Sequence, residues 1–312
     1  SEPLTKLVEV ISQGIGTISK PYIIKKTADA KAYEIKKIAE TIKEHQETLK
    51  TIDYNDTKLS LQSIDKEIID SDGIPIEERT VKRIDYQENK RQQNIEDITQ
   101  KTFSHLENET EVSDEKVNED WTTRFFNYAQ DISDDEMQEL WARILAGEVK
   151  RPNSFSLRTL ELIKNLSKQE AEIFKRIANL TIISHGRPCI FKGKNGSEEY
   201  LAQYGCSFEN RLLLIEIGLL QPDSMISRNI PANNTDKPHY IYYESGNVLI
   251  RQTIQPKSQK IQIPIYRYSK IGEELLDIIL PQPKMDYLKE FGDFLKNKKI
   301  EMEFVYILIK DK

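Results

Sequence analysis

Apolar residues recur with helical spacing most clearly in residues 133–180. The first repeat forms one broad apolar face, made of Met137, Leu140, Trp141, Ile144 and Leu145. Two shorter amphipathic segments follow, at residues 157–163 and 171–178. Because the links between these segments are short, the pattern predicts a compact helical bundle.

Capping signals predict where these helices begin and end. Ser133 and Glu136 have the spacing of a capping box, in which each side chain accepts a hydrogen bond from a backbone N–H, and Ser167 and Glu170 repeat it. Gly147 is expected to end the first helix, since glycine is common just after a helix.

An aromatic helix is predicted just before the bundle. Trp121, Phe125 and Tyr128 fall on one side of it and are expected to pack on Leu140 and Trp141. The predicted structural core of this region comprises Trp121, Phe125, Leu140, Trp141, Ile144 and Phe174.

A heptad-like pattern occupies residues 28–52, with apolar residues seven apart and a second row three residues later. It predicts self-association through Ile35, Ile38, Ile42, His45, Leu49 and Ile52. His45 is interpreted as a polar position that sets the register. The alternatives are packing within the chain, on a helix predicted at 58–69 or on the long helix that follows.

Residues 76–103 predict a long helix whose middle is almost entirely polar, which indicates an arm or a polar interface. Residues 107–120 are acidic and predict a solvated linker. Residues 4–22 predict a small amphipathic helix followed by lysines. Packing on another helix is the favoured explanation, with peripheral membrane contact as the alternative.

After residue 180 the pattern changes to short strands. Residues 240–244 and 248–254 flank Ser245-Gly246-Asn247 and predict a hairpin, with another strand at 261–268. Helices followed by this hairpin predict a winged-helix-like domain.

The predicted fold class is therefore mainly α with a smaller α+β part. Residues 1–74 are expected to form amphipathic and coiled-coil-like helices, and 75–119 the long polar helix and acidic linker. Residues 120–180 are expected to form the central bundle, and 181–312 the winged-helix-like domain.

Composition adds mainly exclusions. Charged residues make up 31% of the 312 and hydrophobic ones only 38%, which suits long, partly solvated helices. A net charge of −6 disfavours a general attraction for nucleic acid. No signal-peptide pattern is present, and no apolar stretch approaches the ~20 residues that span a bilayer. We expect a cytoplasmic protein.

No catalytic, cofactor-binding or metal-binding motif is recognisable, and no cofactor is predicted. His185, Cys189 and Cys206 lack a fourth ligand at zinc spacing. A winged helix would usually contact DNA, for which the candidate residues are Arg211, Arg251, Lys257 and Lys260. The helix at 208–216 offers few donors, so a protein-binding or structural role is favoured.

The capping box and the block that follows it carry a family resemblance. The block reads Leu140-Trp141-Ala142-Arg143-Ile144-Leu145-Ala146-Gly147-Glu148. It resembles a bacterial family described only as a domain of unknown function and, more weakly, the abortive-infection alpha proteins. The resemblance implies a bacterial protein with a helical core, found near phage-defence genes, and it implies no activity.

The leading hypothesis is a non-enzymatic interaction protein that forms a homo-oligomer and binds another protein, as a sensor or regulator in antiphage defence. The alternatives are a DNA-binding regulator and a membrane-active effector that uses its first helix.

Overall fold

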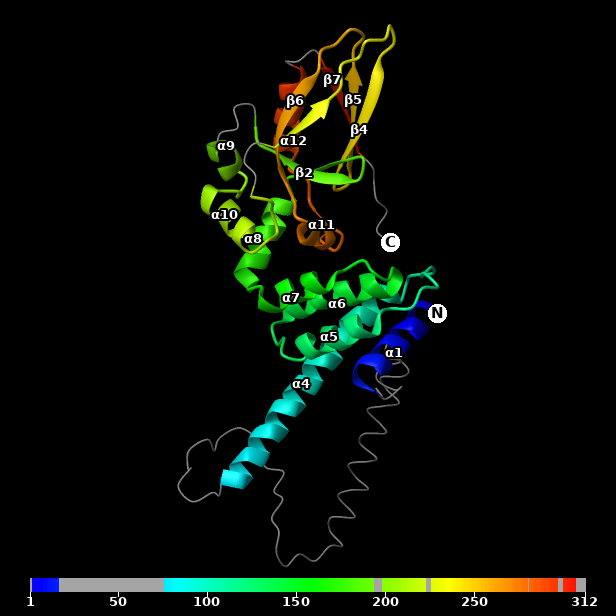
Figure 1. Ribbon diagram of the computed structural model, residues 1–312, viewed down its shortest axis with the longest axis vertical. Helices are drawn as coiled ribbons and strands as arrows, with labels where there is room; N and C mark the ends of the chain where they lie inside the picture. The colour runs from blue at the N-terminus through cyan, green and yellow to red at the C-terminus, as the bar shows by residue number, and fades with distance from the viewer. Residues whose placement is uncertain are drawn as a thin grey trace, which may run out of the picture.

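The computed structural model describes residues 2–16, 76–193, 198–222, 226–279, 281–296 and 300–306. The six residues predicted for self-association and the helix predicted at 58–69 lie outside these ranges. Within them, the chain is a mixed α+β protein with a helical part followed by a sheet part (Figure 1).

The helical part contains six described helices. They are α1 (Glu2–Ile15), α4 (Ile76–Leu106), α5 (Glu119–Ala129), α6 (Asp135–Lys150), α7 (Leu157–Asn165) and α8 (Lys168–Ala178). The aromatic face of α5 packs on α6, as the pattern predicts: the ring centroids of Phe125 and Trp141 are 5.2 Å apart. The apolar side of α1, with Leu7, Val10 and Ile11, is buried.

Two helix ends differ from the capping prediction. Asp134, not Ser133, is the N-cap of α6 and accepts hydrogen bonds from the backbone N–H groups of Glu136 and Met137. The Ser133 hydroxyl instead accepts a bond from Asn94. Gly147 lies inside α6, which continues to Lys150. A Cβ at this position would lie 2.7 Å from the Phe155 ring, so a glycine is needed there. The capping box of Ser167 and Glu170 is present.

The sheet part begins with β1 (Thr181–Ser184) and β2 (Arg187–Phe191). It continues through α9 (Glu198–Ala202), α10 (Phe208–Glu216), β3 (Ser227–Ile230), β4 (His239–Ser245), β5 (Val248–Ile254), β6 (Ile261–Arg267), α11 (Lys270–Leu276), α12 (Met285–Lys296) and β7 (Ile300–Tyr306). The described strands form one antiparallel sheet in the order β3-β6-β2-β1-β4-β5-β7. Helix α12 packs on one face of the sheet. There the ring centroid of Phe291 lies 5.1 Å from that of Phe191 and 5.6 Å from that of Tyr243.

The winged-helix detail of the prediction is not confirmed. The predicted hairpin forms, with Ser245 opposite Val248 around Gly246-Asn247. However, β4 also pairs with β1, and β5 also pairs with β7. These strands are therefore interior strands of a larger sheet rather than a free wing. Local strand patterns do not reveal such distant pairings.

One buried carboxylate connects the two parts, and a second holds the loop between α6 and α7. Glu274 of α11 accepts hydrogen bonds from the Ser156 backbone N–H, at 2.8 Å, and from the Thr159 hydroxyl at the start of α7. Glu148 of α6 accepts bonds from the backbone N–H groups of Asn153 and Phe155, at 2.7 and 3.0 Å. Burial raises the pKa of Glu148, and these backbone bonds oppose the shift.

Candidate functional site

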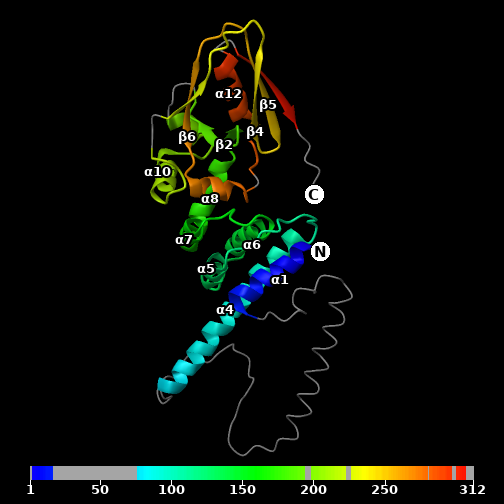
Figure 2. The same ribbon diagram turned by 45° about the vertical axis from the view of Figure 1, so that its right-hand side comes forward.

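Helix α4 has two halves with different surroundings. Its second half packs on α6, α5 and α1 and buries Asn94, Ile95, Ile98, Thr99, Thr102 and Leu106. Its first half extends away from the other described elements (Figures 1 and 2). Every residue at 76–90 is exposed, and we call this segment the α4 arm.

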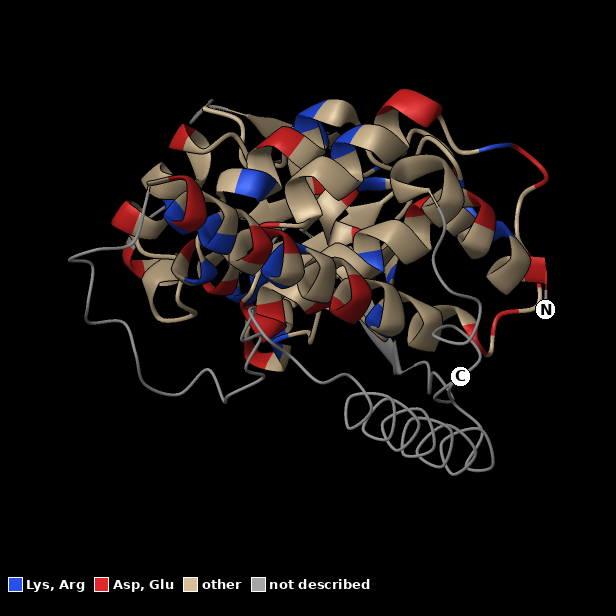
Figure 3. Cartoon of the chain, turned by 90° about the horizontal axis from the view of Figure 1, so that it is seen from below, with Lys and Arg blue, Asp and Glu red and all other residues tan. Residues whose placement is uncertain are grey.

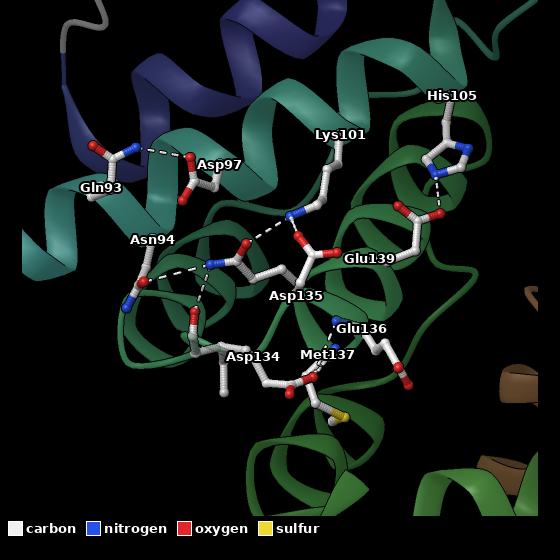
Figure 4. Close-up of polar contacts among 12 residues, drawn as sticks. Gln93, Asn94, Asp97, Lys101, His105, Asp134, Asp135, Glu136, Met137 and Glu139 are labelled. Atoms are coloured by element: carbon white, nitrogen blue, oxygen red, sulfur yellow. Dashed lines mark hydrogen bonds and ion pairs between the residues drawn. The ribbon is translucent and has the colours of Figure 1, made fainter.

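The covered half is held to α6 by a polar interface (Figure 4). The Asn94 amide donates to the Gln130 carbonyl, in the turn before α6, at 2.8 Å. The Gln138 amide of α6 lies 3.5 Å from the side-chain oxygen of Asn94. Lys101 reaches both Gln138 and Asp135, each at 2.7 Å. Because Asn94 and Gln138 are buried, these bonds are available only at one register of the two helices.

The polar interface continues towards the end of α4. A nitrogen of His105 lies 2.9 Å from Glu139, which also accepts a hydrogen bond from Arg143 at 2.9 Å (Figure 4 shows the His105–Glu139 contact). The Thr102 hydroxyl lies 3.3 Å from the Ala142 carbonyl. The polar middle of the long helix is thus partly an interface and partly an arm.

Arg91 marks the boundary between the halves. It donates to Asp131 at 3.0 Å and to Glu88 at 2.8 Å, and these hydrogen bonds raise its pKa. Asp131 follows α5, so Arg91 ties α4 to the folded bundle just after the arm ends. Both carboxylates are largely exposed, so the contacts position α4 more than they stabilise it.

The arm carries an apolar row in phase with the buried face. Val81 lies two heptads before Ile95, and Ile84 lies two heptads before Ile98. Glu88 and Arg91 occupy the positions between them. Val81 is 56% exposed and Ile84 45%, whereas Ile98 is completely buried. The same side of one helix is therefore covered in one half and open in the other.

Tyr86 is an exposed residue on the other side of the arm and can serve as a control for substitutions of Val81 and Ile84. It is 63% exposed and lies about 200° around the helix from Ile84, on the opposite side. Ile76, 64% exposed, begins the helix. The apolar row at Val81 and Ile84 can thus be tested separately from exposed apolar residues in general.

The predicted core residues occupy the bundle interior, with one exception. Trp121, Phe125, Trp141, Ile144 and Phe174 are buried. Leu140 is only half-buried because it lines a groove of about 590 Å³ between α6, α8 and α11. Charges along this groove pair with each other, as in Lys168–Glu136 at 2.9 Å. No nucleophile and base stand together there.

The structure does not gather the candidate nucleic-acid contacts on one surface. Arg211 is buried, against expectation, because its guanidinium packs over two aromatic rings. The guanidinium carbon lies 4.8 Å from the ring centroid of Tyr266 and 5.2 Å from that of Phe208. Arg251 is half-buried on β5, and the exposed Lys257 and Lys260 follow that strand. Figure 1 shows α10 at the base of the sheet part, away from the β5–β6 connection.

Charges of both signs alternate over the helical end of the molecule, seen from below in Figure 3. Lys and Arg do not form a continuous area on that face. This pattern does not favour phosphate backbones, which attract clustered cations.

The metal and membrane hypotheses gain no geometric support from the described residues. No three His, Cys, Asp or Glu side chains among them are placed to hold a metal. Burial raises the pKa values of Cys189 and Cys206 to about 11, so both thiols stay protonated at neutral pH. None of the described helices combines the length and apolar character needed to cross a bilayer.

Comparison with known proteins gives one match. The family model described as "Protein of unknown function (DUF2806)" matches residues 78–291, from the α4 arm to α12 and across the capping-box block. No curated protein and no solved structure matches the chain. The resemblance to a family of unknown function is thus confirmed, whereas similarity to abortive-infection alpha proteins is not shown. The chain belongs to the DUF2806 family.

Proposed function

We propose that this protein is a non-enzymatic assembly protein whose chain self-associates through the α4 arm. In this proposal, the arm of one copy packs against the heptad pattern predicted at residues 28–52 of a second copy. The bundle and sheet then act as the sensing or regulatory body in bacterial antiphage defence. The defence role rests on the sequence resemblance of the capping-box block alone.

The observation that best supports this proposal is that the exposed Val81 and Ile84 occupy the same heptad positions as the buried Ile95 and Ile98. An isolated helix as short as the arm is marginal in water and gains most of its stability by covering an apolar side. The arm has the apolar positions for such a contact. Its own bundle covers none of them.

Dimensions support the 28–52 segment as the partner of the arm. At 1.5 Å per residue, the arm is roughly 22 Å long, and the predicted 28–52 helix is roughly 37 Å. The sequence predicts two neighbouring apolar rows for this segment, one of which consists of Ile35, Ile42 and Leu49. A helix of this kind would cover the arm along its whole length.

Light scattering of Ile84→Asp tests the proposal. The wild type is expected to have a mass above that of one chain, and Ile84→Asp to approach one chain, because a carboxylate in the apolar row opposes burial. Tyr86→Asp is the matched control and should keep the wild-type mass. A single-chain mass for the wild type would refute self-association and favour packing within the chain. Equal masses above one chain for all three folded proteins would refute a contact through the α4 arm.

The two alternatives have weaker support. Exposed Lys257 and Lys260 favour nucleic-acid binding by the sheet part, but the buried Arg211 and the carboxylates on α10 count against it. Membrane contact through α1 would require its apolar side, which is already buried against protein.

A further inference from the structure

The second turn of helix α10, Leu212 to Ile215, is apolar on all sides although the helix lies at the surface. Leu214 faces the interior, while Phe208 is 43% and Leu212 46% exposed. These two residues are one turn apart on the same side of the helix. Figures 1 and 2 both show α10 at the outer edge of the sheet part, without a described element on its outer side. A surface helix that is apolar on its open side is typical of a protein interface.

The exposed charges of α10 itself are negative. Glu209 and Glu216 are exposed, and neither forms an ion pair with another described residue. Hydrogen bonds from its own backbone N–H and from the Ser207 hydroxyl lower the pKa of Glu209, so it is ionised at neutral pH. Arg211, the one cation of α10, lies inward under two rings. Ahead of the helix, the exposed Arg176 lies beside Gly205.

An apolar groove begins where α10 ends. It encloses about 480 Å³, and its apolar lining consists of Leu162, Leu166, Ile217 and Ile271. Glu161, Glu170 and Arg158 are the charged residues along it. Lys164 contacts Glu161 at 3.4 Å, and the Tyr128 hydroxyl donates to Glu161 at 2.6 Å. Arg158 and Lys164 balance Glu161 and Glu170 in the groove, so the exposed negative charge beside Phe208 and Leu212 comes from Glu209 and Glu216 on α10.

We propose that α10 and this groove, together called the α10 face, bind a basic amphipathic helix of a partner protein. Aliphatic side chains of that helix pack on Phe208 and Leu212 and enter the groove. Its lysines or arginines lie beside Glu209 and Glu216. This binding site is separate from the α4 arm. It also differs from a DNA-reading helix, because phosphates would be repelled by the carboxylates that attract a basic helix.

The experiment measures fluorescence anisotropy of a labelled amphipathic peptide of leucine and lysine at physiological salt. A peptide with glutamate in place of lysine is the second probe. Wild-type protein is expected to bind the lysine peptide and not the glutamate peptide. Leu212→Ser and Glu216→Lys should each weaken binding about tenfold, as expected for an interface anchor and a complementary charge.

Two control variants distinguish binding at the α10 face from non-specific binding to exposed apolar residues and from an effect of self-association. Tyr242→Ser removes another exposed apolar side chain, on β4, and should leave the affinity unchanged. Ile84→Asp should also leave it unchanged, whatever its effect on oligomeric mass. The proposal is overturned if the lysine peptide fails to bind, if Leu212→Ser binds as well as wild type, or if Tyr242→Ser loses as much affinity. Direct binding of labelled duplex DNA to the wild type that Leu212→Ser abolishes would also overturn it, in favour of a nucleic-acid site.

Discussion

The two halves of α4 share one helix and one heptad phase, yet they have opposite environments. In the second half, Ile95 and Ile98 are buried against the bundle, and Asn94 and Lys101 form bonds to the turn before α6 and to α6 itself. In the first half, Val81 and Ile84 hold equivalent positions and are exposed. The apolar row is thus a property of the sequence, whereas its burial depends on which segments surround it. In the proposed assembly, a second copy covers the open row.

The difference also shows what fixes each half in place. The covered half combines apolar packing with buried polar groups, which permit only one register. The arm has few apolar positions, and Glu88 and Arg91 interrupt the row. The contact proposed for the arm should therefore be weaker than the contacts of the covered half and reversible.

The largest expected loss of stability comes from disrupting the bundle core that covers the second half of α4. Trp141 is completely buried and packs edge-on against Phe125. Trp141→Ala should lower the free energy of unfolding by about 3–5 kcal/mol, as large aromatic truncations do. Urea unfolding followed by circular dichroism measures this. A free energy of unfolding equal to that of the wild type would show that the bundle does not depend on this core.

A smaller loss is expected at the polar interface. Asn94→Ala removes the donor to the Gln130 carbonyl and leaves the Ser133 hydroxyl without that contact. The free energy of unfolding should fall by about 1–3 kcal/mol, the cost of leaving buried polar groups unpaired. Gln93→Ala, whose side chain makes an exposed bond to Asp97 on the same helix, is the matched control and should change little. Equal losses for both variants would contradict a register-setting role for Asn94.

Several of these features could be predicted from the sequence, because they depend on nearby residues. Helical spacing located α4 to α8, and Ser245-Gly246-Asn247 located the hairpin. Features that depend on distant contacts could not be predicted. Ser133 is not the N-cap, since its hydroxyl meets Asn94 from another helix. Gly147 does not end α6, since its missing side chain makes room for Phe155.

The candidate sites follow the same division. The sequence predicted Arg211 as an exposed donor, whereas in the structure its guanidinium is buried against two aromatic rings. The polar middle of the long helix indicated an arm or a polar interface, and α4 contains both. The partners of this interface on and before α6 could not be predicted. The order of the seven described strands is likewise not encoded in any local pattern.

DNA binding should show a small effect or none. The four candidate contacts are not gathered together, and one is buried, so few phosphates can be neutralised. A plot of log K against log salt should have a slope near zero. Nanomolar affinity at physiological salt with a steep slope would instead make nucleic acid the main partner.

Arm substitutions should have the smallest effect on the stability of the single chain. Ile84→Asp and Tyr86→Asp both change exposed residues, and each should shift the free energy of unfolding by less than about 0.5 kcal/mol in dilute solution. Chemical unfolding at low protein concentration measures this. A large loss for Ile84→Asp alone under those conditions would place the partner of the arm within the same chain.

Amide hydrogen exchange along α4 over a protein dilution series tests the account most directly, because it measures both halves of one helix in one sample. Self-association predicts that residues 76–90 are protected at high concentration and lose protection on dilution, while residues 94–106 stay protected throughout. In Ile84→Asp the arm should exchange rapidly at every concentration, and in Tyr86→Asp it should behave as in the wild type. Protection of the arm that is the same at all concentrations, or absent at all of them, would contradict assembly through α4.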